Sequence, residues 1–199
     1  MKYKGLMIDH THESPSDEEI HEVECNLGRK IPKDYKEFLI KCNGGYLDYE
    51  LLIEEEYIAL SQLYSIFHNG GCETNPFELK HAKNNKLIPS YVLPIATDGG
   101  GSILYLDLRH GYQLMASIRG LPEWTKGNRK SVLIKISNSF EEYINKLLIS
   151  DETAELHIDN FEISESSVRA TIDWLDSGNE EWKDKFRNKW NSRVNLIKI

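Results

Sequence analysis

The feature that most constrains this chain is a pair of helix signals near its start, separated by a glycine and a proline. Ser16 and Glu19 form a capping box, in which each side chain can satisfy a backbone N–H of the first helical turn. Gly28 ends the first apolar stripe, and Pro32 suits the first turn of a second helix because its missing N–H costs nothing there. Asn43-Gly44-Gly45 tolerates the positive φ with which helices commonly end. The segment therefore predicts two consecutive helices.

Residues 46–60 change from helical spacing to β character. Two strands with a charged turn at Glu54–Glu56 fit this segment best. Short helices are expected at 61–67 and at 76–86, the second with a proline in its first turn.

The middle of the chain predicts a sheet whose strands are joined by short turns. A helix follows it from Ser139, where a second capping box reaches Glu142. Short turns imply antiparallel pairing, because a parallel crossover needs a dozen or more residues. We therefore expect an α+β fold, with a mainly antiparallel sheet of about five to six strands flanked by helices. The predicted strands are 91–96, 102–108, 112–118 and 131–136.

The C-terminal quarter has a different composition. Residues 151–165 are acidic and contain no Lys or Arg, whereas the last stretch of the chain is basic. After the acidic stretch come two helical patterns, the second of which carries Trp182 and Trp190 and overlaps the basic stretch. We expect a domain over 1–150 and an appended helical extension over 151–199 that packs on it.

Composition limits the classes of partner. The net charge is −8, which disfavours direct binding of nucleic acid and suits a basic protein partner. No apolar run reaches the roughly 18 residues of a membrane helix, and the first residues lack a signal-peptide core. Three widely spaced cysteines indicate neither a disulfide framework nor a zinc knuckle. These features favour a cytoplasmic protein.

No motif in the chain indicates a catalytic, cofactor or metal site. The glycine triplet after Asp98 precedes a strand, whereas a phosphate loop opens a helix, so a turn is favoured. His10 and His12 lack further ligands nearby in the sequence. Carboxylates are abundant, so a hydrolase with a dispersed acid/base pair stays open as an alternative.

Two groups of residues are candidates for binding a partner. Acidic residues crowd the 46–60 segment, where a solvated turn is the simpler interpretation and a patch for a cationic partner is the second. The tryptophans of the extension are more often the buried face of a docked helix, although Trp is enriched in binding hot spots. The candidates are Asp48, Glu50, Glu54, Glu55, Glu56, Trp182 and Trp190.

Three blocks of the sequence resemble the SUKH superfamily (the Smi–Knr family) over about residues 16–150. The first block has Glu, Leu-Gly, Ile-Pro, an aromatic, Phe-Leu and Asn-Gly in the family's order. The second has Pro-Ile, an Asp-Gly turn and a strand ending in Asp, and the third begins a helix with Ser-Phe. The matching signature positions include Glu24, Leu27, Gly28, Pro32, Tyr35, Phe38, Asn43, Gly44, Pro94, Asp98, Gly99, Gly101, Asp107 and Phe140.

The resemblance implies a non-enzymatic immunity protein that binds a cognate secreted toxin, commonly a nuclease, inside the producing cell. It implies neutralisation by covering the active or substrate surface of the toxin, with no cofactor and no membrane. An alternative is an intracellular scaffold or regulator similar to the yeast cell-wall-synthesis members of the superfamily. The sequence leaves open the toxin, the binding surface and the oligomeric state.

Overall fold

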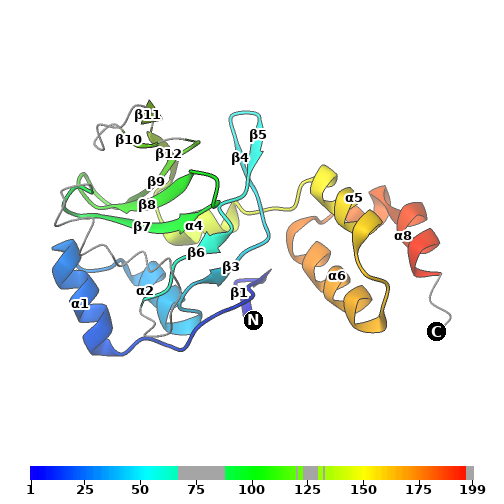
Figure 1. Ribbon diagram of the computed structural model, residues 1–199, viewed down its shortest axis with the longest axis horizontal. Helices are drawn as coiled ribbons and strands as arrows, with labels where there is room; N and C mark the ends of the chain where they lie inside the picture. Colours follow the sequence, from blue (N-terminus) through cyan, green and yellow to red (C-terminus); the bar gives the residue numbers. More distant parts are fainter. Residues whose placement is uncertain (67–87, 120, 123–129, 132, 196–199) are drawn as a thin grey trace.

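The computed structural model describes residues 1–66, 88–119, 121–122, 130–131 and 133–195 of the chain (Figure 1). Its centre is a six-stranded antiparallel sheet with the strand order β12-β9-β8-β7-β6-β3. Helices flank this sheet, so the expected α+β class is confirmed. The strands of the sheet are β3 (Gly45–Tyr46), β6 (Gln62–Leu63), β7 (Val92–Thr97), β8 (Ile103–Asp107), β9 (Gln113–Ser117) and β12 (Leu133–Ser137).

Smaller elements surround the main sheet. Three two-stranded pairs are β1 (Lys2–Tyr3) with β2 (Leu6–Met7), β4 (Leu51–Ile53) with β5 (Glu56–Ile58), and β10 (Leu121–Pro122) with β11 (Lys130–Ser131). The helices of the first 150 residues that the structure describes are α1 (Asp17–Leu27), α2 (Lys33–Lys41) and α4 (Phe140–Asn145).

The predicted start and end of the first helix are confirmed. The Ser16 hydroxyl accepts from the Glu19 N–H at 3.2 Å, and the Glu19 carboxylate accepts from the Ser16 N–H at 2.7 Å. Gly28 adopts a left-handed conformation at φ 80° after the last residue of α1. A Cβ there would lie 3.0 Å from the ring of Tyr91, so both conformation and space favour glycine.

Glu24 and Asn43 are buried polar side chains that tie the two helices into the domain. Glu24 accepts from Lys30 and from the Ile31 N–H just before α2, and it is 8% exposed. Burial opposes its ionisation, but these bonds hold the pKa of Glu24 below its ordinary value. The side chain of Asn43 bonds both backbone groups of Ile66. Both signature residues therefore have structural roles.

An aromatic cluster joins the helices beneath the sheet. The ring of Phe38 lies 4.9 Å from that of Phe140, and the ring of Tyr35 lies 5.0 Å from it. Phe140 begins α4, which packs on β9 and β12. The helix predicted from Ser139 is confirmed, although Glu142 accepts from the N–H of Asn138 and not from that of Ser139.

The glycine triplet forms the expected turn. Asp98 Oδ1 accepts from the N–H groups of Gly100 and Ser102 at 2.7 and 2.8 Å. Asp107, at the end of β8, accepts in the same way from the N–H of Arg109 at 2.9 Å. Both carboxylates therefore hold turns at the ends of neighbouring strands.

One predicted helix is wrong and another lies outside the described residues. Within 61–67, residues Gln62–Leu63 form β6, which pairs with β3 on one side and with β7 on the other. Sheet pairing on both sides satisfies the backbone of this segment and outweighs local helix propensity. The helix expected at 76–86 falls outside the part of the chain that the structure describes.

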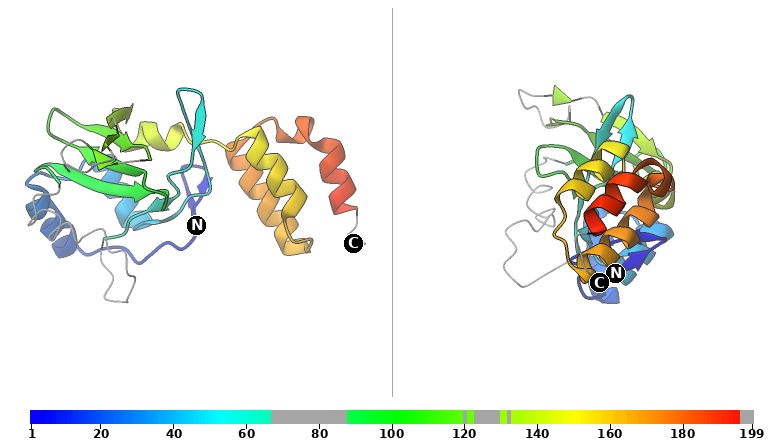
Figure 2. Two further views of the ribbon diagram at one scale, coloured as in Figure 1. Left: turned by 45° about the horizontal axis from the view of Figure 1, so that its top comes forward. Right: turned by 90° about the vertical axis from the view of Figure 1, so that its right-hand side faces the viewer.

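The C-terminal helices gather at one end of the molecule, beside β1 and β2 (Figure 2). They are α5 (Asp151–Asn160), α6 (Glu165–Gly178), α7 (Trp182–Lys185) and α8 (Arg187–Val194). The acidic stretch beginning at 151 is therefore largely helical. Gly178 fits against the sheet domain so closely that a Cβ would lie 2.6 Å from Ile149 Cγ1 and 2.9 Å from Tyr49 Cε1.

Candidate functional site

The first candidate site is a groove between the β4–β5 hairpin and the β12 edge of the main sheet. Two adjoining hollows of about 600 Å³ and 440 Å³ form it, and Ile53, Glu54 and Ile134 line both. We call this surface the hairpin groove. β12 ends the strand order of the sheet, and no described strand pairs with its outer side.

The hairpin groove combines apolar and acidic side chains with two lysines at its β12 side, Lys135 and Lys146, the second of which is paired with Glu142. Leu52 is 55% exposed within it, and Tyr57 on the same hairpin is 48% exposed. Glu54 and Glu55 form the turn and make no ion pair with the residues that the structure describes, whereas Glu56 lies 3.5 Å from Arg119. Exposed apolar groups beside uncompensated carboxylates are the chemistry of a protein-binding surface for a basic partner.

Glu50 does not belong to this acidic surface. Its carboxylate accepts from the Ser150 N–H at 3.0 Å and from the Thr153 hydroxyl at 2.8 Å. These bonds join the segment before β4 to the first turn of α5. Glu50 therefore has a structural role, and the structure separates it from Glu54, Glu55 and Glu56.

Packing accounts for the two tryptophans of the extension. Trp182 is 2% exposed, and its indole N–H donates to Asp176 at 2.8 Å. Trp190 is half-buried, with its ring 5.1 Å from that of Trp182 and 5.5 Å from that of Phe161. The buried-face interpretation therefore fits both residues, and Trp182 presents no surface to a partner.

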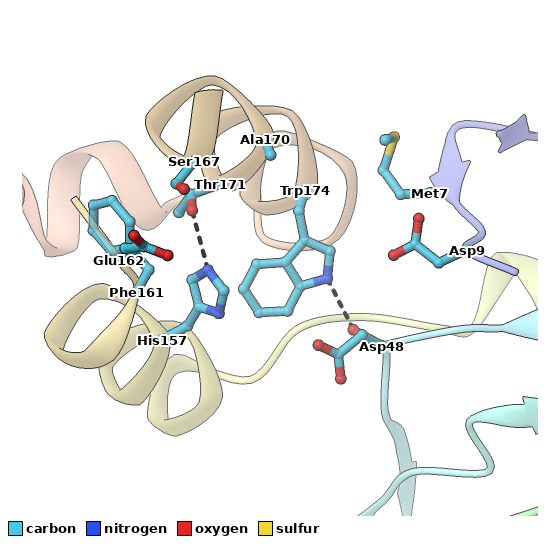
Figure 3. A pocket seen from close by; sticks show the side chains of 10 residues that line it. All are labelled: Met7, Asp9, Asp48, His157, Phe161, Glu162, Ser167, Ala170, Thr171 and Trp174. Atoms are coloured by element: carbon cyan, nitrogen blue, oxygen red, sulfur yellow. Dashed lines mark hydrogen bonds between the residues drawn. The ribbon is translucent and has the colours of Figure 1, made fainter. Parts of the chain in front are cut away.

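The second candidate site is a pocket of about 350 Å³ where the C-terminal helices meet residues of the first fifty positions of the chain (Figure 3). We call it the junction pocket. Helices α5 and α6 supply His157 and Trp174, and the loop after β3 supplies Asp48. Met7 of β2 and Asp9 complete the opposite wall.

Hydrogen bonds fix the ring side chains of the junction pocket. The indole N–H of Trp174 donates to the backbone carbonyl of Asp48 at 2.9 Å, and His157 Nε2 lies 3.1 Å from the Thr171 hydroxyl. The two rings are 4.5 Å apart and tilted by 48°. Burial lowers the pKa of His157 despite the nearby carboxylate of Asp48, so this imidazole is neutral at pH 7.

Sequence reasoning identified Asp48 but missed the rest of the junction pocket. Trp174 and His157 lie on separate helices and Asp9 lies near the start of the chain. Only tertiary packing brings them together, so no local spacing signal could have predicted the pocket.

Two further properties of the described residues bear on the chemistry of the chain. Among the described residues, no three His, Cys, Asp or Glu side chains come close enough together to hold a metal ion. No helix in the same part of the chain has the length and apolar content that a membrane crossing requires.

Comparison with known proteins agrees with the residue signature. The SMI1 / KNR4 family (SUKH-1) matches residues 14–146, which include the two N-terminal helices, the main sheet and α4. The SPbeta prophage-derived uncharacterized protein YokK of Bacillus subtilis (strain 168) is 28% identical over 156 residues, covering 70% of this chain and 77% of that protein. The matched family region ends before α5.

Proposed function

Because this chain belongs to the SMI1 / KNR4 family (SUKH-1), we propose that it is an immunity protein that binds and neutralises a cognate protein toxin. The family match over residues 14–146 carries the proposal. The role requires recognition of a protein surface and no chemistry of its own. It places the protein in the cytoplasm of the cell that makes the toxin.

The hairpin groove is the proposed contact surface. A nuclease toxin holds a polyanionic substrate with basic residues, and an acidic protein surface is complementary to them. The turn carboxylates Glu54 and Glu55 would meet these residues, and Leu52 and Tyr57 would supply apolar contact area. Occupying the substrate surface would block the toxin without altering its catalytic residues.

Co-expression tests this function. The full chain is expressed together with a candidate toxin domain of the nuclease class, and survival and a co-purified complex are scored. We expect survival and a stable complex with the wild-type chain. Toxicity that persists beside folded, abundant protein would overturn the proposal, whereas binding of several endogenous proteins without protection would favour the scaffold alternative.

A matched pair of variants tests the surface. One carries Glu54→Lys, Glu55→Lys and Glu56→Lys. The control reverses three exposed carboxylates elsewhere and therefore changes the net charge equally; its substitutions are at Glu22, Glu152 and Glu180. We expect loss of protection with the hairpin variant alone. Equal protection by both variants would place the contact surface elsewhere.

A further inference from the structure

We propose that the junction pocket binds an organic cation: a guanidinium or ammonium group carried on a short alkyl chain. The pocket shares no lining residue with the hairpin groove, so this inference does not rest on the proposed function. Its volume of about 350 Å³ is near the lower end of ligand sites, which suits a single side chain or a small amine.

The pocket has carboxylates from three separate parts of the chain. Asp9 follows β2, Asp48 follows β3, and Glu162 follows α5. All three are exposed and make no ion pair with a described residue, and none of the pocket's lining residues is Lys or Arg. The lining therefore carries three carboxylates and no cation, although the guanidinium of Arg193 lies 5.5 Å from the ring of the lining residue Phe161.

The pKa of Asp48 responds to its surroundings in the pocket. Partial burial raises the pKa of its carboxyl; His157 opposes the shift when it is protonated, and the carboxylates of Glu50 and Asp9 raise the pKa further. A nearby negative charge makes a carboxyl harder to ionise, and a bound cation would offset the repulsion between Asp48 and Asp9. The electrostatic preference of the pocket is therefore for positive charge.

Aromatic side chains line the inner part of the same pocket. Figure 3 looks onto the indole of Trp174, which lies between His157 on one side and Asp9 and Asp48 on the other. Trp174 is 8% exposed and is held by its bond to the Asp48 carbonyl, so the ring is already in place before a ligand arrives. Tryptophan is the strongest cation–π partner, and the neutral imidazole of His157 adds no repulsion.

The geometry favours an organic cation over a metal ion. Among the described residues, the carboxylates do not gather into a group that could hold a metal. An organic cation is wider, has a weakly hydrated surface and can contact a carboxylate rim and an aromatic wall at once.

The direct test uses Nα-acetyl-L-argininamide (argininamide below) as the probe and Nα-acetyl-L-citrulline amide (citrulline amide below) as its neutral analogue of nearly equal shape, since acetylation removes the α-amino charge from both. Binding to the full-length chain is measured by calorimetry and by the NMR signals of the indole N–H groups. We expect argininamide to move the Trp174 signal and to leave that of Trp182, which is bonded to Asp176, in place. Equal binding of citrulline amide, or an unmoved Trp174 signal, would overturn the proposal.

A charge-removing variant tests the carboxylates. Asp48→Asn with Glu162→Gln keeps the side-chain shapes and the backbone carbonyl that holds Trp174. We expect affinity for argininamide to fall by about tenfold. The control, Glu152→Gln with Glu180→Gln, removes the same charge outside the pocket and should bind as the wild type does. Equal affinity in the two variants would refute the site.

Two additions complete the test. If the double variant does not fold, Asp9→Asn replaces it. Asp9 is bonded to Tyr46 through its backbone N–H and carbonyl, and the substitution leaves both groups unchanged. Agmatine and the blocked peptide acetyl-Gly-Arg-Gly-amide distinguish the sources of the cation. Stronger binding of the peptide assigns the pocket to an arginine of a protein partner, and stronger binding of agmatine assigns it to a free small molecule. Binding of neither would contradict the proposal.

Discussion

The acidic side chains of α5 and those of the β4–β5 hairpin have different neighbours. On α5, Asp151 lies 2.8 Å from Lys185, and Glu155 lies 2.7 Å from Lys189, both on the basic C-terminal segment. On the hairpin, Glu54 and Glu55 have no such partner among the described residues. The chain therefore neutralises one acidic region internally and leaves the other available, so composition alone does not locate a binding surface.

The apolar side chains of the helical extension and of the β4–β5 hairpin differ in exposure. Trp182 is 2% exposed in the helical extension, whereas Leu52 and Tyr57 of the hairpin are 55% and 48% exposed. Burial in the extension stabilises the fold, and exposure on the hairpin leaves apolar area for a partner. The following predictions test this contrast.

The largest expected effect comes from Trp182→Ala. Removing this buried ring should lower the free energy of unfolding by about 3–5 kcal/mol, since it leaves a cavity and removes the hydrogen bond to Asp176, whose carboxylate keeps its ion pair with Lys183. Tyr57→Ala should change the free energy of unfolding by less than about 0.5 kcal/mol because the Tyr57 side chain is exposed. Urea unfolding measures both. A large loss in the Tyr57 variant would contradict the assignment of that side chain to a partner surface.

A smaller loss is expected from Gly178→Ala, which tests how the extension is packed. The added Cβ would meet Ile149 at 2.6 Å, and overpacking of this kind costs about 1–3 kcal/mol. Gly178 is the last residue of α6, so the higher helix propensity of alanine offsets only a small part of the loss. Thermal unfolding measures the net change, with Gly100→Ala in an open turn as the control. A stabilised Gly178 variant would show that the close approach is relieved at little cost.

The ion pairs of the extension should contribute less and depend on salt. Lys189 lies within 2.8 Å of both Glu155 and Asp159, and these carboxylates raise its pKa. Lys189→Gln should lower stability slightly at low ionic strength, and the difference should shrink as salt is added. Melting temperatures across a salt series measure it. A difference that is independent of salt would mean that the lysine acts through packing.

The smallest effect concerns pH. Burial lowers the pKa of His157 below 6.5, so the unfolded chain binds its proton more readily than the folded chain does. Stability should therefore fall as pH decreases below about 6.5. Asp48 faces this imidazole and reduces the effect. Urea unfolding at a series of pH values measures this dependence. His157→Gln should flatten the curve of stability against pH below about 6.5, whereas His21→Gln, at an exposed position, should not. Identical curves for the wild type and His157→Gln would contradict the buried neutral state.

Local signals in the sequence were sufficient for most of the fold. The capping box at Ser16, the stop at Asn43 and the Asp98 turn are interactions between near neighbours in the chain, and each is formed as expected. The strand Gln62–Leu63 was missed because its pairing partners are distant in sequence and its own two residues carry no alternating pattern.

The candidate sites were harder to predict for the same reason. The sequence identified the acidic residues of the hairpin but grouped them with Glu50, which is bonded to residues 100 or more positions away. The basic tail and the acidic α5 were each visible, but their pairing depends on how α8 packs on α5. A sequence shows where charged residues gather, but only the fold shows which of them form ion pairs with one another.

The central claim is that the uncompensated hairpin carboxylates contact a basic protein toxin. The most direct measurement is the association rate of the toxin domain with the wild type and with Glu54→Gln/Glu55→Gln, over a range of salt concentrations. We predict that the hairpin variant associates several-fold more slowly at low salt and depends less on salt, while Glu152→Gln/Glu180→Gln behaves as the wild type does. Equal association rates and salt slopes for all three proteins would contradict the account.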